Sequence, residues 1–559
     1  AIVARPRATG FAAITNSVGR IGTLENFGTL NWSILLVYLV ANLLLGYFLS
    51  RRVETADDYY LGRRTTPWWV IGISVIATYV SALSFLGGPA WSYSDGLSVI
   101  AIHLNYPLVV LLVITLFLPF FFNSGVASIY DYQEKRFGTR SRTVIVLIFL
   151  VTQALSSAAI LYATALVLQF ITGIDVIWAI VIMTVVALVY TTLGGITAVL
   201  WTDFIQAAIL FVGAIIITVA LINNLSEPLG ETLLALKQQG KLQALNFSFD
   251  PTQVTTIWSG VVAMTLYHTT VYGANQMMVQ RTLAAKNIGD AKKSFLLMGF
   301  SAFFIYFLFI MLGVLFYSYY GGREFENSNT IILQFAADLG LPGLMGILAA
   351  AVLAASMSTL DSSFNSMATV TTIDLYEKHL KPGQTSQHYL KASRWFTVLW
   401  AMVVVIPAIA YSSSEGSILE TLTKIGSFFV GAKLSMFALG FFSRQTTEAG
   451  LLVGVAVGFA AVWYAATQTD IAWPWYCLIG AGVNVAVSIP ASIMISGWQT
   501  EDSPYSIRGQ IAVFRDGKLP ERENGWFRQP GRIDRVSYLL LAFFVASVGF
   551  LVGFEHLVG

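Results

Sequence analysis

Long apolar stretches, separated by short polar segments, fill almost the whole chain. A helix that spans a membrane needs about 20 mainly apolar residues, and fourteen stretches of the sequence meet that requirement. They lie near residues 30–50, 67–89, 98–122, 143–171, 174–195, 203–224, 256–280, 294–319, 340–375, 393–411, 417–443, 449–466, 473–497 and 536–556. The pattern predicts an all-α polytopic membrane protein with about fourteen transmembrane helices. We expect one transmembrane domain over residues 30–559, preceded by a polar leader at residues 1–29 without an assigned role.

The positive charges are distributed unevenly between the two sides of this topology. If the N-terminus lies outside, the inner segments carry 24 of the 32 Lys and Arg residues, and the outer segments carry 6. The remaining two, Lys424 and Lys433, fall within a predicted span, and we expect Lys433 to extend its amine towards the inner surface. Because positive residues accumulate in cytoplasmic segments, we predict a multi-pass protein of the plasma or inner membrane with both termini outside.

Composition excludes several functional classes. Charged residues make up 11% of the chain, against about 25% in typical soluble domains. The net charge of +2 gives no indication of a nucleic-acid partner, and the single cysteine, Cys477, excludes an intrachain disulfide. The sequence contains no GxxxxGK[ST] loop and no HExxH motif, and its longest polar stretches, at about 225–255 and 498–535, are too short for an appended domain. We therefore predict no enzymatic activity, no ATP hydrolysis and no obligatory protein partner.

The span at 67–89 combines helix-breaking residues with a cluster of hydroxyls. Gly87, Gly88 and Pro89 directly follow the hydroxyl-rich segment 76–86. An interrupted helix at membrane depth is tolerated only where it lines a cavity. The pattern favours functional unwinding around residues 77–84, and a proline-kinked helix end is the alternative.

A later span carries an unusual number of oxygen-bearing side chains. Five serines, a threonine and Asp361 lie within residues 354–366, and helical spacing places Ser358, Thr359 and Ser362 on one face. Small hydroxyl residues also let membrane helices pack closely, but packing requires no carboxylate. Hydroxyl, carbonyl and carboxylate oxygens are the hard ligands that bind Mg²⁺ and Ca²⁺, and the same oxygens suit Na⁺.

Three groups of residues resemble the sodium:solute symporter family. They are Thr192–Gln206, Asn275-Gln276 with Gln280-Arg281, and Ser358-Thr359 with Asn365-Ser366. The similarity extends in consistent order from about residue 30 to about residue 445. It implies two inverted repeats of five helices each, here about 67–224 and 256–443, with a broken helix opening each half. The helices at about 30–50, 449–466, 473–497 and 536–556 are then peripheral.

The resemblance implies a principal sodium site at the break in the first helix of the repeat. Carried over residue by residue, its ligands are the carbonyls of Ala77, Val80 and Ala355 and the hydroxyls of Ser358 and Thr359. This set joins the unwound segment to the hydroxyl face of the later span.

A second sodium site, which only some family members use, falls on Asp203, Ser358, Asp361 and Ser362. The family pattern has Ser, Thr or Ala at the position of Asp361, so this chain departs from it by adding a carboxylate. Two carboxylates in one site do not both ionise unless a cation lies between them. The pair therefore either binds a second Na⁺ more strongly or keeps a proton, which leaves the number of bound Na⁺ ions at one or two.

The expected solute site departs most from the family. The sugar-binding positions of the family correspond to Ser84, His103, His268 and a position near Lys424. Histidines thus replace the glutamate and the asparagine of a galactose transporter, and Tyr272 lies next to the position of its gating tyrosine. The two histidines and Lys424 favour an anionic or carboxylate solute, although an intramembrane histidine often serves only as a hydrogen-bond link between helices.

These features predict a sodium-coupled symporter that imports a small organic solute by alternating access. The resemblance leaves a sugar, a sugar acid and a monocarboxylate open as solutes. The alternatives are a solute-sensing membrane domain that works with a separate signalling partner, and a channel.

Overall fold

The computed structural model describes residues 27–50, 53–124, 128–325, 327–411, 418–517 and 519–558. Within these ranges the side chains of residues 50, 124, 190, 193, 194 and 418–425 are outside the description. Most of the predicted leader at 1–29, and the side chain of Lys424, therefore lie outside the described part of the chain.

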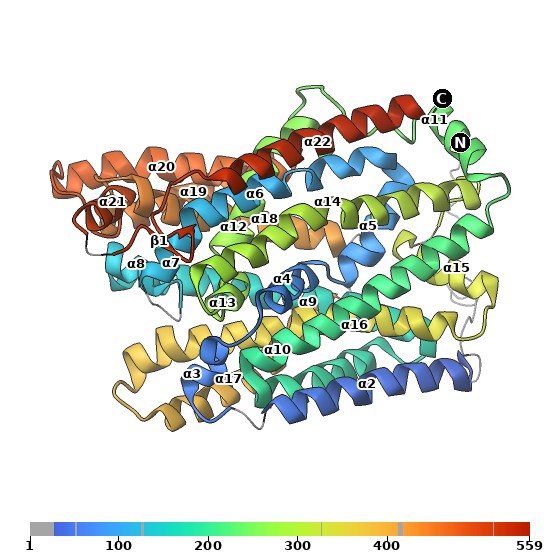
Figure 1. The fold of residues 1–559 in the computed structure, drawn as a ribbon, viewed down its shortest axis with the longest axis horizontal. Coiled ribbons are helices and arrows are strands. Elements are labelled where there is room, and N and C mark those ends of the chain that lie inside the picture. Colours follow the sequence, from blue (N-terminus) through green and yellow to red (C-terminus); the bar gives the residue numbers. More distant parts are fainter. Residues whose placement is uncertain are drawn as a thin grey trace, which may run out of the picture.

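The described residues form a bundle of helices with one short hairpin (Figure 1). The first half contains α2 (Thr29–Ser50), α3 (Ala56–Leu61), η2 (Gly62–Arg64), α4 (Trp68–Tyr79), α5 (Ala82–Asp95), η3 (Gly96–His103), α6 (Tyr106–Leu112), η4 (Val113–Phe117), α7 (Leu118–Ser124), α8 (Asp131–Arg136), α9 (Thr139–Thr172), α10 (Val176–Asn223) and α11 (Leu229–Gln238). The second half contains η5 (Ser259–Ala263), α12 (Met264–Gly273), α13 (Gln276–Leu283), α14 (Ile288–Tyr319), η6 (Ser328–Thr330), α15 (Ile331–Leu339), α16 (Leu344–Val370), η7 (Thr371–Leu380), α17 (Ser386–Tyr411), α18 (Ile418–Phe442), α19 (Glu448–Gln468), α20 (Pro474–Ser496), α21 (Ile507–Arg515), β1 (Arg522–Glu523), β2 (Trp526–Phe527) and α22 (Arg535–Leu557).

The bundle exposes apolar side chains on its periphery, as expected of a protein whose solvent is lipid. Among the described residues, ten helices are long and apolar enough to cross a membrane, and three further apolar helices are shorter. The outer helices α2 and α22 lie on opposite sides of the bundle (Figure 1), and large exposed residues on them include Val37, Phe48 and Val545. By contrast, the span that contains α16 is almost entirely buried, so the polar residues of α16 face other helices rather than lipid.

The predicted count of fourteen spans stays a prediction. Each predicted span overlaps at least one helix of the described chain, but the helices are divided differently from the apolar stretches. The spans expected at 174–195 and 203–224 form the single element α10, which is kinked at Gly195. Gly195 has φ 55° and ψ −160°, and a Cβ on it would lie 2.8 Å from Tyr59. The kink therefore depends on glycine, and it brings α10 against α3.

The predicted interruption near residues 77–84 is present, but Gly87, Gly88 and Pro89 are not its cause. The helix breaks between α4 and α5, and these three residues lie within α5. At this position α5 approaches α14 closely, and Gly313 of α14 permits the approach, since a Cβ on it would lie 2.1 Å from the Pro89 carbonyl oxygen. The second helix expected to be broken is also interrupted, between α12 and α13, where the Asn275 side chain caps α13.

A cluster of charged side chains joins α8, α9 and η7 at one end of the bundle. Arg142 forms ion pairs with Asp131 at 2.9 Å, Glu134 at 2.6 Å and Asp374 at 2.6 Å, and Lys378 also binds Glu134 at 2.7 Å. Burial alone would raise the pKa of Glu134, but the bonds from Lys378 and Arg142 outweigh burial and lower its pKa to about 2. A carboxylate with a lowered pKa stabilises the fold until the pH falls through the folded value, so this link persists at physiological pH.

Candidate functional site

The break between α4 and α5 releases two backbone carbonyls from their helical partners. In a continuous helix the Ser81 amide would donate to Ala77, but it donates to the Tyr79 carbonyl at 2.9 Å. Likewise, the Ser84 amide would donate to Val80, but it donates to Ser81 at 3.0 Å. The carbonyls of Ala77 and Val80 are two of the three that the family resemblance implied as sodium ligands, and the local geometry makes both available for another partner.

The hydroxyl face of α16 lies against this break. Thr359 donates through Oγ1 to the Thr78 carbonyl at 3.0 Å and to the Ala355 carbonyl at 3.3 Å. The neighbouring Ser358 is buried and donates to Asp203 Oδ1 at 2.6 Å. The structure thus brings together the two segments that were expected to form the first sodium site, and the oxygen atoms of this site are neutral.

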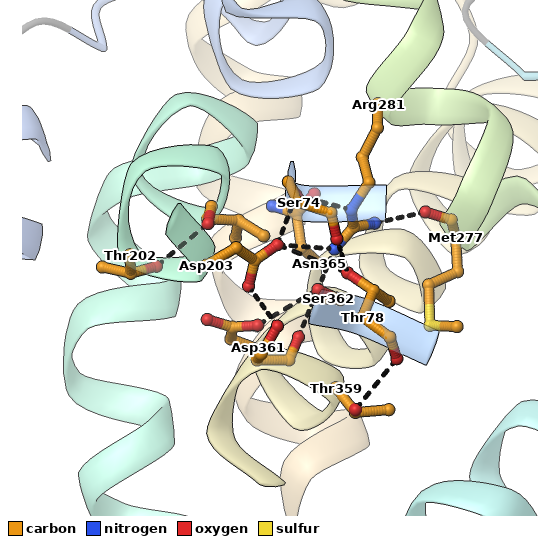
Figure 2. Close-up of polar contacts among 12 residues, drawn as sticks. Ser74, Thr78, Thr202, Asp203, Met277, Arg281, Thr359, Asp361, Ser362 and Asn365 are labelled. Carbon is orange, nitrogen blue, oxygen red and sulfur yellow. Dashed lines mark hydrogen bonds and ion pairs between the residues drawn. The ribbon is translucent and has the colours of Figure 1, made fainter. Parts of the chain in front are cut away.

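Asp203 of α10 lies at the centre of a buried polar network (Figure 2). Its carboxylate accepts hydrogen bonds from Ser74, from Ser358 at 2.6 Å, from Thr78 at 3.3 Å and from the Arg281 guanidinium at 3.2 Å. These donors belong to α4, α16 and α13, so Asp203 links four helices. A buried carboxylate requires such partners because desolvation of an unpaired charge is costly.

Arg281, like its partner Ser74, belongs to this network but was missed by sequence reasoning. The side chain is 1% exposed; its Nε donates to Ser74 at 3.0 Å, and its other nitrogens bind Asp203, Ser362 and the Met277 carbonyl. In the predicted topology Arg281 was counted among the positive charges of the inner segments, although it belongs to the Gln280-Arg281 group that resembles the symporter family. Its place in that group was the only available signal, because no local pattern distinguishes a buried arginine from one that ends a helix.

The residues expected for a second sodium site lie together, with Arg281 among them (Figure 2). Ser362 donates to the Ser358 carbonyl at 2.5 Å and to Asp361 Oδ1 at 3.1 Å, and it also accepts a bond from Arg281. Asp361 is fully buried. With both carboxylates ionised, the formal charges of Asp203, Asp361 and Arg281 sum to −1, which one monovalent cation would neutralise; a proton on one carboxyl group would do the same.

A central cavity of about 250 Å³ adjoins the break. It lies between α4, α5, α9, α12 and α18, and Thr78 and Thr359 form part of its wall. Its polar lining residues include Ser84, His103, Gln153, Asn275 and Lys433, and its aromatic lining residues include Tyr79, Trp91, Tyr267, Tyr306 and Trp473. The cavity and the expected first sodium site therefore share a wall.

His268 contributes to the cavity mainly by holding Tyr79. Asn105 Nδ2 donates to the carbonyls of Ile102 at 2.9 Å and Gly260 at 2.8 Å, so its Oδ1 is the acceptor for His268 Nδ1 at 2.8 Å. His268 Nε2 then accepts from the Tyr79 hydroxyl at 2.6 Å. Both ring nitrogens of His268 are thus occupied, and the imidazole acts as a neutral link between Asn105 and Tyr79.

Of the other residues expected at the solute site, some line the cavity and others do not. Ser84 and His103 line the cavity, and the His103 ring stacks on Tyr306 with 3.7 Å between centroids. Tyr272 does not line the cavity; it is buried behind Tyr79, with 5.2 Å between the ring centroids. Lys433 was expected to extend towards the inner surface, but it is buried and lines the cavity.

Comparison with known proteins identifies relatives of the chain. The family model of the sodium:solute symporter family matches residues 59–458. The sodium/sialic acid symporter NanT of Aliivibrio fischeri is 30% identical over 472 residues, which cover 83% of this chain and 93% of that protein. The mouse sodium-coupled monocarboxylate transporter 1 is 31% identical over 417 residues, covering 73% of this chain and 67% of that protein.

A solved structure of a Na⁺-coupled sialic acid symporter, substrate-bound and outward-open, superposes with a TM-score of 0.79 and 27% identity. The alignment covers 85% of this chain and 100% of that one. These relatives are sodium-coupled transporters rather than enzymes, which confirms the prediction that the chain is not an enzyme.

Proposed function

Because the chain belongs to the sodium:solute symporter family, we propose that it is a sodium-coupled symporter of a small organic solute. The solute, a sugar, a sugar acid or a monocarboxylate, occupies the central cavity and crosses the membrane by alternating access. The expected first Na⁺ site is formed by the carbonyls of Ala77, Val80 and Ala355 and the hydroxyls of Ser358 and Thr359.

The observation that carries this proposal is the position of Thr359. Its hydroxyl donates to the Thr78 carbonyl beside the released carbonyls of the break, and both residues also line the cavity. An ion held there would fix the same backbone segment that forms the solute site. Binding energy gained at one site is then available to order the other, which is the physical requirement for coupling.

Transport into proteoliposomes tests the proposal. A positive charge that moves inward across 100 mV gains about 2.3 kcal/mol, which corresponds to roughly 50-fold accumulation for each Na⁺. We expect an inward Na⁺ gradient, but not a matched K⁺ gradient, to drive uptake of at least one of lactate, N-acetylneuraminate and glucose. We also expect Na⁺ to raise the Tm of the purified protein above its value in K⁺. Uptake and Tm that are both indifferent to Na⁺ would contradict the proposal.

We propose that Asp203, Asp361, Ser358 and Ser362 hold a second Na⁺. Asp361→Asn removes one of the two carboxylates expected to bind the second Na⁺, so the cluster would attract a second cation less strongly. We expect the Hill coefficient of Na⁺-dependent uptake to fall towards one, while the relative rates for different solutes remain unchanged.

Ser356→Ala is the matched control for this variant, because Ser356 lies on the same helix but bonds to Thr164 of α9. The control should keep the Hill coefficient of the parent protein. If the Hill coefficient of the parent protein is already one and Asp361→Asn does not change it, a transported second Na⁺ is excluded.

A further inference from the structure

Among the described side chains of α18, one cationic residue, Lys433, lines the central cavity. Gly426, Val430 and Lys433 line the cavity at positions i, i+4 and i+7, which places them on one face of the helix. Lys433 is 3% exposed. No aspartate or glutamate occurs among the cavity-lining residues of the described chain.

Lys433 differs from the other buried basic residues in lacking a partner. Lys292 is similarly buried but donates to the Phe527 carbonyl at 2.8 Å, and Arg142 and Arg281 both form ion pairs. No hydrogen bond or ion pair connects Lys433 to any residue in the described part of the chain. A buried ammonium without an anion is costly, and ionisable residues placed inside a membrane protein commonly serve its substrate pathway.

We propose that Lys433 binds the carboxylate of the transported solute, so that the solute supplies the missing negative charge. This inference rests on the proposed symport function and narrows its solute class. The resemblance to known transporters did not identify Lys433, because the family positions for solute binding corresponded to Ser84, His103, His268 and the region of Lys424.

The size and lining of the cavity further restrict the solute. A volume of about 250 Å³ lies below the range of about 300–1,000 Å³ that is usual for pockets that bind drug-sized ligands. Rings of Tyr267 and Trp473, whose centroids are 6.0 Å apart, belong to the cavity wall together with Val430. An ammonium together with an aromatic and aliphatic wall fits a compact monocarboxylate with a short carbon chain.

Binding of lactate and of lactamide, its neutral analogue of the same shape, tests this assignment. In the parent protein in Na⁺, we expect lactate to bind more tightly than lactamide by about 10- to 100-fold, the difference typical of a hydrogen bond to a charged group. Lys433→Met should weaken lactate binding by a similar factor and remove the preference over lactamide. Lys433→Arg keeps the charge and should restore part of the preference. Lys292→Met, a matched buried lysine outside the cavity, should leave the preference intact.

The outcomes separate this inference from the proposed function. The Tm increase caused by Na⁺ should persist in Lys433→Met, because Lys433 is not part of the sodium site. If Na⁺ raises the Tm of neither the parent protein nor any variant, that result would count against symport itself. Lactate preference that survives in Lys433→Met would overturn the role of Lys433. Tighter binding of N-acetylneuraminate or glucose than of lactate would overturn the assignment of a compact monocarboxylate. If Lys433→Met does not fold, the affinities of the parent protein for lactate and lactamide test the inference. Equal affinities for the two ligands would overturn it.

Discussion

Replacing Arg281 with methionine should lower the free energy of unfolding by about 3–5 kcal/mol and abolish transport. The change removes one partner of a buried ion pair, which is the type of substitution that carries a penalty of this size. Asp203 would lie at the junction of α4, α10 and α16 without its guanidinium, and the hydroxyl of Ser362 would lose a donor. Unfolding of the purified protein in detergent, followed by its intrinsic fluorescence, measures the loss.

A double-mutant cycle distinguishes the ion pair from simple loss of packing. If the pair is responsible, Asp203→Asn together with Arg281→Met should be less harmful than the sum of the two single changes, because no unpaired charge remains. Additive effects would indicate that Arg281 acts only by filling space. Arg444→Met is the matched control: Arg444 also forms an ion pair, with Asp502 at 2.6 Å, but on the surface, where such pairs contribute little.

The sequence predicted the helical membrane fold because that prediction depends on local properties. Apolar stretches of sufficient length identify spanning segments whatever the tertiary structure. The hydroxyl-rich stretch of α16 was equally visible, since Ser358, Thr359 and Ser362 share a face by helical periodicity alone. The residue pattern also predicted a break around residues 77–84, which the structure places at residues 80–81; the family resemblance then added the expected sodium site at that break.

Features that depend on contacts between distant segments were missed or misinterpreted. Gly87, Gly88 and Pro89 indicated a broken helix, but they lie within α5, where Gly313 of α14 allows close packing against Pro89, a contact that only the tertiary structure reveals. Arg281 meets Asp203 across 78 positions of the sequence, and no periodicity reports such a pair. Lys433 was expected to extend towards the inner surface because that is the common behaviour of lysine near a helix end. Its direction is set instead by the face that α18 presents to the cavity.

Replacing Thr359 with alanine should raise the Na⁺ concentration required for half-maximal uptake by about 10- to 100-fold. The expected site has neutral oxygens only, so each one carries a large share of the interaction, and a bond from a neutral group to a charge is typically worth about 1.5–3 kcal/mol. The same change removes the hydrogen bond to the Thr78 carbonyl at 3.0 Å, which holds the break against α16. Uptake measured over a series of Na⁺ concentrations, at constant ionic strength, gives the half-maximal value.

Thr359→Ser retains the hydroxyl and should keep the sodium requirement within a few-fold of that of the parent protein. The difference between the serine and alanine variants separates loss of a sodium ligand from destabilisation of the fold. At saturating Na⁺ the alanine variant should recover most of its maximal rate, because the cavity keeps its shape and Lys433 is untouched. An unchanged sodium requirement in Thr359→Ala would remove the first sodium site from its expected place, whatever the maximal rate. If the sodium requirement rises while the Tm in K⁺ stays that of the parent protein, the substitution affects ion binding rather than folding. Coupling between the sodium site and the cavity, through the wall that Thr78 and Thr359 share, then explains the change in uptake.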